Sequence, residues 1–281
     1  MGNNKKRTKN KVFAVFTVIF VAMSVTELYI SNRALEVERL EVFIKGLPKV
    51  FDGYRIAHIS DLHGAEFGKY NIDLANVIRE EKPDIIVITG DYIDNAGDVG
   101  MVYTTARTLC GVAPVYYVPG NHEYGSKIAS AVFKDLETAG VNVLRNQSEI
   151  LNIGGEELIL LGIDDPNGPA GMITMQRAVE LVRDKSRAPI VMLNHRYDRA
   201  EEIAKLDVAL ALTGHAHGGL IRLPFTDGLI GPGRVIFPKY TNGLYEIDGL
   251  TMVTSRGIGN AGISFRVFNR PHIPIITLRS K

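Results

Sequence analysis

The sequence lacks the features that mark several classes of protein. Among its 281 residues it has one cysteine, Cys110, which excludes an intrachain disulfide and a cysteine-rich zinc site. Its 32 basic and 31 acidic residues nearly cancel, so the composition gives no sign of a nucleic-acid-binding surface. It also has no internal repeat and no low-complexity segment. What remains is a globular composition, 46% hydrophobic, long enough for one large domain or two small ones.

A long apolar run lies near the N-terminus. Residues 1–11 contain five basic residues and no acidic one, residues 12–25 carry no charge, and apolar residues continue past Glu27 to Ile30. A helix over residues 12–30 would span roughly 28 Å, close to the thickness of a membrane's hydrocarbon core. We predict a transmembrane signal anchor within residues 1–30, with its basic end in the cytoplasm. The rest of this single-pass chain would then be extracytoplasmic. A signal peptide cleaved at the small residues Ala22 and Ser24 is the alternative.

Polar and apolar residues alternate over residues 31–50, which predicts an edge strand or stalk that connects the anchor to a domain at 51–281. Short apolar runs and helical patterns then alternate, which indicates an α/β fold. The predicted strands lie at residues 54–60, 84–88, 115–118, 158–163, 190–193 and 208–212, and the predicted helices at 71–80, 101–109, 128–139 and 174–183. Residues 234–278 are predicted to be rich in β structure, with turn signals at Asn242-Gly243 and Asp248-Gly249.

Polar clusters follow five of these strands, and they use five of the chain's seven histidines. Any single cluster could be ordinary turn chemistry, because Asp, Asn and Gly favour turns. In alternating α/β folds, however, ligands bind beyond the carboxyl ends of the strands. Carboxylates and imidazoles that converge there would form a metal site. The two remaining histidines, His58 and His272, are predicted to be a core or supporting residue and a structural residue.

The ordered set of clusters resembles the calcineurin-like metallophosphoesterase superfamily. The clusters are Asp61-Leu62-His63, Gly90-Asp91, Gly120-Asn121-His122-Glu123, His195 and Gly214-His215-Ala216-His217. The tail, with Gly218-Gly219, Leu223-Pro224 and Gly257-Ile258-Gly259, resembles the membrane-anchored bacterial branch. His272 and Leu220 depart from that branch, where an acid and a polar residue are usual. The fold expected is a four-layer sandwich of two mixed β-sheets flanked by helices, with the site at the carboxyl edges of the strands.

The resemblance implies two divalent metal ions. Asp61, His63 and His217 would hold one, Asn121, His195 and His215 the other, and Asp91 would bridge them. Mixed carboxylate and imidazole ligands suit Mn, Fe or Zn, whereas Mg and Ca prefer oxygen ligands. A hydroxide between the metals would attack phosphorus in line.

The resemblance also assigns the groups beside the metals. His122 would be the general acid for the leaving group or a donor to the phosphate, and Asp94 would orient it. Glu123 is a further candidate for that orienting role.

The sequence therefore predicts a metal-dependent phosphoesterase that hydrolyses a phosphodiester or a pyrophosphate. The anchor and the apolar residues Leu223, Pro224, Phe225, Leu229 and Ile230 favour lipid-linked or cell-wall substrates. That apolar loop could equally pack on the β-rich tail. The alternative function is a non-catalytic metal-binding membrane protein on the same fold, since a fold alone does not establish activity.

Overall fold

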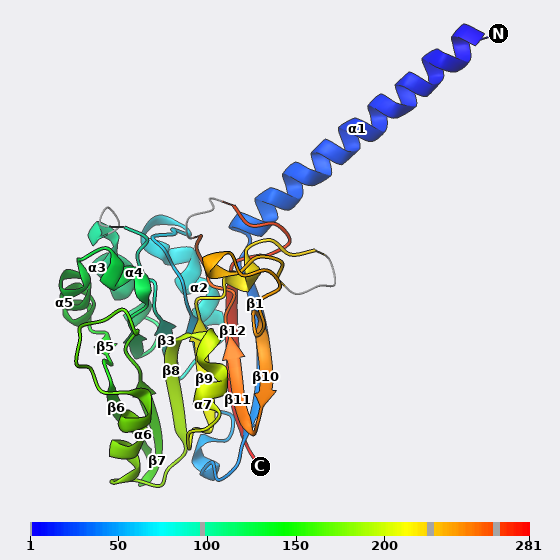
Figure 1. The fold of residues 1–281 in the computed structure, drawn as a ribbon. Coiled ribbons are helices and arrows are strands. Elements are labelled where there is room, and N and C mark those ends of the chain that lie inside the picture. The colour runs from blue at the N-terminus through cyan, green and yellow to red at the C-terminus, as the bar shows by residue number, and fades with distance from the viewer. Residues whose placement is uncertain (1, 96–98, 224–227, 261–264) are drawn as a thin grey trace.

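Two six-stranded sheets stack against each other in the computed structural model, which describes residues 2–95, 99–223, 228–260 and 265–281 (Figure 1). In order across the first sheet lie β1 (Glu36–Ile44), β12 (His272–Ser280), β2 (Arg55–Ile59), β3 (Ile85–Thr89), β4 (Val115–Val118) and β5 (Asn142–Val143). Across the second lie β10 (Gly243–Ile247), β11 (Leu250–Thr254), β9 (Leu210–Gly214), β8 (Ile190–Arg196), β7 (Glu156–Gly162) and β6 (Gln147–Ile153). Each sheet contains parallel and antiparallel pairs, so both are mixed, as predicted.

The side-chain alternation of the strands builds the layers. In β3, Ile85 and Val87 enter the core between the sheets, while Ile86 and Ile88 face the helices outside. The helices are α2 (Ile72–Glu80), α3 (Val99–Cys110) and α5 (Ala129–Ala139) over the first sheet and α6 (Met175–Arg183) and α7 (Ala200–Ile203) over the second. A strand buried on both faces reads as a continuous apolar run, which is why the sequence shows these strands clearly. The predicted four-layer sandwich is confirmed.

Each of the six strands and four helices predicted between residues 54 and 212 is present, with ends displaced by a few residues. The short helix α4 (Asn121–Gly125) and the strands β5 and β6 were not predicted. Most of β6 is exposed, because it is the outer strand of its sheet, and it therefore lacks an apolar run.

The C-terminal part contains less β structure than predicted. Asp248 and Gly249 form the turn of the β10–β11 hairpin, with positive φ at both residues, as the Asp-Gly signal indicates. Asn242-Gly243 instead leads into β10 and does not join two strands. The predicted β structure therefore begins at Gly243 and not at residue 234.

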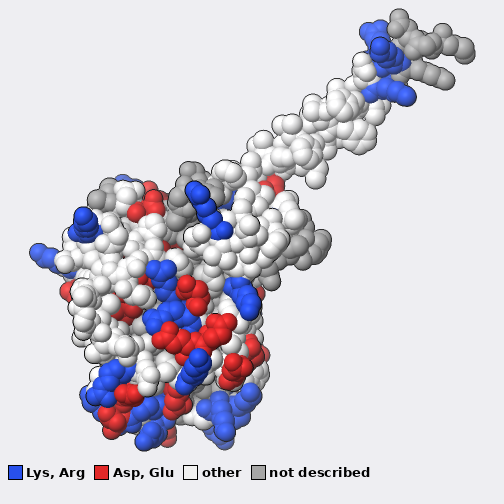
Figure 2. All heavy atoms as spheres, viewed as in Figure 1, with Lys and Arg blue, Asp and Glu red and all other residues white. Residues whose placement is uncertain are grey.

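The N-terminal helix α1 (Gly2–Arg33) projects away from the two sheets (Figure 1). Residues 6–33 are long and apolar enough to cross a membrane, and no residue of their most apolar 18-residue window is buried. Figure 2 shows the helix as a largely uncharged rod with Lys and Arg side chains at its free end.

The segment that follows α1 forms an edge strand. All nine residues of β1 pair in parallel with β12, and the side chains of Val42 and Ile44 enter the core between the sheets. The segment thus forms the edge strand that was one of the two predicted alternatives.

Candidate metal centre

The end of β8 and the loops after β2, β3, β4 and β9 meet at one edge of the sandwich. Asp61, His63, Asp91 and His217 form one buried group whose candidate ligand atoms lie within 4.8 Å of one another. Asp91, His195 and His215 form a second such group. Asn121 joins it, because its Oδ1 lies 3.1 Å from His195 Nε2. All seven predicted ligands are therefore brought together.

Asp91 occupies the centre of these groups. Its Oδ2 atom lies 3.2 Å from His195 Nε2, 3.6 Å from His63 Nε2 and 4.0 Å from His122 Nε2. This oxygen is buried and accepts no hydrogen bond from the part of the chain that the structure describes. A buried carboxylate oxygen without donors is costly unless a cation compensates it. The position suits a carboxylate that bridges two cations.

Pairs of imidazole nitrogens face each other on both sides of Asp91. His63 Nε2 lies 3.2 Å from His217 Nε2, with Asp61 Oδ1 3.5 Å from the latter. On the other side, His195 Nε2 lies 3.1 Å from His215 Nδ1. Two imidazole nitrogens that face each other with their lone pairs repel unless a proton or a cation lies between them. The nitrogen and oxygen donors fit two divalent ions of the Mn, Fe or Zn type.

The backbone at these residues is strained. Five of the seven candidate ligands have φ between +45° and +66°, the left-handed region, and they are Asp61, His63, Asp91, His215 and His217. This conformation costs a non-glycine residue on the order of 1 kcal/mol. Strain that recurs at so many polar residues indicates that the loops are shaped for a site.

Two glycines allow the ligand loops to approach each other. A Cβ atom on Gly120 would lie 2.2 Å from Asp91 Oδ1, and one on Gly214 would lie 1.8 Å from Ser60 Oγ. Both contacts are too short for any side chain. The glycines that precede Asn121 and His215 in the sequence motifs are thus required by packing.

His195 is fixed by its strand and by a hydrogen bond. The pairing of β8 with β9 shifts register between Asn194 and Arg196, which places His195 in a bulge. Its Nδ1 lies 2.7 Å from the carbonyl oxygen of Thr89, so Nδ1 donates there and Nε2 faces Asp91. His58, the buried neighbour, contacts the Thr89 hydroxyl and lies outside the ligand groups.

The charges at the centre are coupled. Burial alone would lower the pKa of His195, but the Asp91 carboxylate outweighs it and raises the pKa to about 10. Burial and the neighbouring His195 lower the pKa of His215 to about 2. In the metal-free chain the Asp91 charge is therefore balanced by a proton on His195, which a bound cation would displace.

Asp94 contacts two histidines. Its Oδ1 lies 3.3 Å from His122 Nδ1 and 3.5 Å from His63 Nδ1. The first contact is the one expected from the sequence. The second links Asp94 to a candidate metal ligand, and it could not be predicted from the sequence because the two residues lie 31 positions apart on separate loops.

Glu123 ties two loops together. Its buried carboxylate accepts hydrogen bonds from the backbone N–H groups of Gly120, Asp91 and Tyr92 at 2.7, 3.1 and 2.7 Å. No hydrogen bond to His122 is among these contacts, so its place in the structure differs from the orienting role considered for it. It holds the loop after β3 against the loop after β4.

Glu123→Ala is expected to lower the free energy of unfolding by roughly 3 kcal/mol, because several buried N–H groups lose their acceptor. Urea unfolding of the metal-free chain measures the effect, with the exposed α5 variant Glu137→Ala as control. A value for Glu123→Ala equal to that of the control would contradict this account.

Arg196 was not predicted. It forms an ion pair with the buried Asp165 at 2.7 Å, and its Nη1 lies 2.8 Å from His215 Nε2. With Asp91, Asn121 and His122 it lines an open cavity of about 780 Å³. Its position directly after His195 was the available signal. An arginine side chain thus lies in the same cavity as the candidate metal centre.

The chain was compared with known proteins. Its residues 54–219 match the family described as calcineurin-like phosphoesterase. The uncharacterized metallophosphoesterase YkuE of Bacillus subtilis is 33% identical over 258 residues, which cover 87% of this chain and 86% of YkuE. The phosphodiesterase YaeI of Escherichia coli is 27% identical, and the match covers 80% of this chain and 82% of YaeI. A transmembrane protein with a metallophosphoesterase domain from Danio rerio is 27% identical, over 93% of this chain and 61% of that protein.

The family match spans every loop that carries a candidate ligand, and the two-sheet sandwich brings those loops together. The chain therefore belongs to the calcineurin-like phosphoesterase family and is a dinuclear metal-dependent hydrolase of phosphoric esters.

Proposed function

We propose that this protein is a membrane-anchored phosphodiesterase or pyrophosphatase that acts on envelope or lipid-linked substrates outside the cytoplasm. The observation that carries the catalytic part is the position of Asp91 Oδ2, at the centre of the facing imidazoles and beside a cavity of about 780 Å³. That cavity is large enough to admit a phosphoester together with the groups attached to it.

Seven side chains would hold the two cations. Asp61, His63 and His217 would bind one, Asn121, His195 and His215 the other, and Asp91 both. Once bound, two such cations supply a hydroxide near neutral pH and offset negative charge on the phosphoryl oxygens.

In this proposal His122 transfers a proton to the leaving group. Its Nδ1 donates to the carbonyl oxygen or the carboxylate of Asp94, at 3.1 and 3.3 Å, so Nε2 faces the cavity. An imidazole oriented in this way can act as a general acid towards a leaving alkoxide. The backbone N–H of His122 donates to Asp91 Oδ1 at 2.9 Å, which fixes the ring relative to the metal centre.

Asp94→Asn tests whether Asp94 positions one histidine or two. Because Asp94 contacts both His63 and His122, we expect a 10–100-fold loss in kcat together with weaker metal binding, the usual cost of removing a group that orients a ligand. Mn²⁺ affinity and kcat should be measured alongside His122→Ala, which lacks only one of the contacts. Unchanged Mn²⁺ affinity in Asp94→Asn would restrict its role to His122.

The properties of α1 support the proposed anchoring and the proposed side of the membrane. Its apolar stretch is exposed and follows a basic N-terminus, which the positive-inside rule places in the cytoplasm. The proposed domain at 51–281 is joined to α1 by the connecting segment, which also adds the edge strand β1 to its first sheet. The similar Danio rerio protein is named as a transmembrane protein, which supports retention of the helix.

The proposed membrane anchor supports the proposed substrate class. An anchored site meets lipid-linked and cell-wall phosphoesters at the membrane surface. Of the apolar loop, Leu223 is half-exposed and Leu229 and Ile230 are partly buried, whereas Pro224 and Phe225 lie outside the described residues. The similar protein YaeI is named as a phosphodiesterase, which favours a diester.

A substrate screen with the purified full chain tests the proposal. We expect Mn²⁺-dependent hydrolysis of bis(p-nitrophenyl) phosphate, and faster turnover of at least one phosphodiester or pyrophosphate from lipid or envelope fractions. Hydrolysis of small diesters, with no hydrolysis of any lipid or envelope substrate, would contradict the proposed substrate class. Absence of turnover with every divalent metal, on monoesters and diesters alike, would favour the non-catalytic metal-binding alternative.

A further inference from the structure

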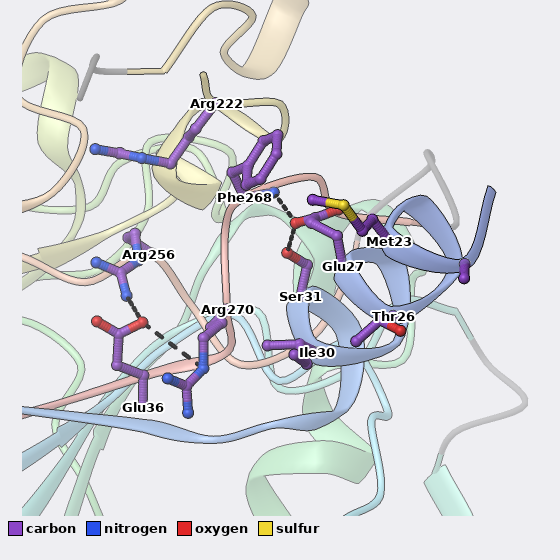
Figure 3. Close-up of a pocket in the computed structure, with 11 residues that line it drawn as sticks. Met23, Thr26, Glu27, Ile30, Ser31, Glu36, Arg222, Arg256, Phe268 and Arg270 are labelled. Carbon is purple, nitrogen blue, oxygen red and sulfur yellow. Dashed lines mark hydrogen bonds and ion pairs between the residues drawn. The ribbon is translucent and has the colours of Figure 1, made fainter. Parts of the chain in front are cut away.

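A second cavity, of about 690 Å³, lies where α1 meets the domain. One side of it is the last part of α1, and the other is formed by β1 and the loops before β10 and β12. Figure 3 shows Met23, Thr26 and Ile30 on the helix side, and Arg222, Arg256 and Arg270 across from them. The cavity shares no lining residue with the one at the metal centre.

The walls of this cavity are held in place by hydrogen bonds. Asn32 at the end of α1 accepts from the backbone N–H of Arg266 at 2.8 Å and donates to its carbonyl oxygen at 3.0 Å. Glu27 accepts from the N–H of Phe268 at 2.6 Å and from the Ser31 hydroxyl. The junction is thus a specific contact between α1 and the domain, made by several hydrogen bonds.

The cavity is apolar at one end and cationic at the other. Arg256 pairs with Glu36 at 2.9 Å and with Asn242 at 2.7 Å, and Arg270 lies 3.9 Å from the same Glu36 oxygen. The Glu27 carboxylate already has two donors. Among the residues that line the cavity there are thus three guanidinium groups and two carboxylates, and Glu38 behind them also interacts with Arg222 and Arg256.

Arg256 supplies a separate indication of an anion-binding site. Its side chain is 9% exposed, and its Nε atom is buried and has no hydrogen-bond partner among the described residues. Burial and the nearby Arg222 lower the pKa of Arg256 despite its contact with Glu36. A buried guanidinium that is only partly satisfied favours an anionic ligand beside it.

The surroundings match a membrane surface. About 20 residues span the hydrocarbon core, so a helix that enters at residue 12 leaves near Ser31. The cavity's helix residues then lie in the outer leaflet, and its arginines lie near the level of the headgroups. Leu223, Phe265 and Phe268, on the two chain segments beside the cavity, are about half exposed, at 50%, 48% and 49%. Aromatic and apolar side chains in such a position insert at the interface.

We propose that this cavity binds a net-anionic membrane phospholipid, with its phosphate at the arginines and an acyl chain along Met23, Thr26 and Ile30. Arginine recognises phosphate through several N–H donors in a fixed plane, and the apolar end continues into the bilayer. This site is distinct from the metal centre and does not rest on the hydrolytic function proposed above.

Binding of the lipid would also affect the metal centre, because residues at the cavity are hydrogen-bonded to the backbone of the loop that carries His217. Arg222 Nη1 donates to the carbonyl oxygen of Gly218 at 3.1 Å, and Asn269 Nδ2 donates to that of His217 at 2.7 Å. The backbone N–H of Asn269 in turn donates a hydrogen bond to the Ser31 hydroxyl at 3.2 Å. Activity is therefore a poor readout for the site, and binding is the quantity to measure.

The test uses the purified full chain in detergent with a chelator, so that no turnover is needed and a failure of hydrolysis leaves the measurement intact. The apparent Kd is obtained from the rise in unfolding temperature with added dioctanoyl phosphatidylglycerol, dioctanoyl phosphatidylcholine or inorganic phosphate. We expect stabilisation by phosphatidylglycerol, and little by the other two at equal concentration.

Two variants and two controls locate the site. Arg222→Gln should weaken binding about tenfold, the usual effect of removing one charged hydrogen bond, whereas Arg177→Gln on α6 should not. Ala22→Phe should block the apolar end, whereas Val21→Phe, whose side chain does not line the cavity, should not. Equal binding of both lipids, no effect of either variant, or stabilisation by phosphate that survives Ala22→Phe would each overturn the proposal.

Discussion

Asp91→Asn is expected to reduce phosphoester hydrolysis by several orders of magnitude and to do more damage than any other ligand substitution. Asp91 is the residue common to both groups of candidate ligands, with its Oδ2 near His63 on one side and His195 on the other. Removing its charge removes the compensation for both cations at once. The loss should therefore appear as lower metal content and lower kcat together.

The fold of Asp91→Asn should remain intact. Asparagine has the same size, and its oxygen can still accept the hydrogen bond from the His122 N–H that Oδ1 accepts at 2.9 Å. Metal stoichiometry, kcat and the circular dichroism spectrum should be compared with those of Asp135→Asn on α5, which removes an acid far from the ligands. Near-normal activity with two metals per chain would show that Asp91 does not bridge.

The strand-end motifs were predictable because each ligand lies at the end of a buried strand or shortly after it in the sequence. β2, β3 and β4 run parallel, as do β8 and β9, so side chains placed just after their ends meet at one edge. An apolar run followed by Asp, Asn or His therefore predicts both the strand and the position of the site. No knowledge of the loop conformations was needed for that part.

The supporting contacts could not be predicted in the same way. Asp94 reaches His63, and Glu123 collects N–H groups from two loops, only because those loops take up particular left-handed backbone conformations. These depend on close packing at Gly120 and Gly214, which a sequence pattern does not specify. Arg196 was missed for a related reason, since its ion pair with Asp165 joins the ends of two strands.

Long-range strand pairing was equally hidden. β1 pairs with β12, more than 200 positions away, and alternation alone allowed either a strand or a stalk. The contact between α1 and the segment around Phe268 is of the same kind. Neither follows from local propensity, because both are set by which surfaces the completed sheets leave exposed.

His122→Ala should separate the chemical step from metal binding. The ligand assigned to this loop is the neighbouring Asn121, whose Oδ1 lies 3.1 Å from His195 Nε2, so removing the imidazole empties no coordination position. His122 keeps a partly exposed side chain in the cavity, whereas His63, His195 and His217 are buried. We expect two metals per chain and a rate loss of about 10²–10⁴-fold, typical of a missing general acid.

The size of that loss should depend on the leaving group. A nitrophenolate leaves without much protonation, so aryl diesters should lose least, whereas alkyl diesters, whose leaving alkoxide is strongly basic, should lose most. Rates across a series of leaving groups, with metal content measured on the same samples, test this for the wild type and His122→Ala. An equal loss for every leaving group would instead assign His122 to holding the phosphate, because that contact does not depend on the basicity of the departing oxygen. A fall in bound metal would make His122 a ligand, and its 4.0 Å distance from Asp91 Oδ2 would then have to shorten when a cation binds.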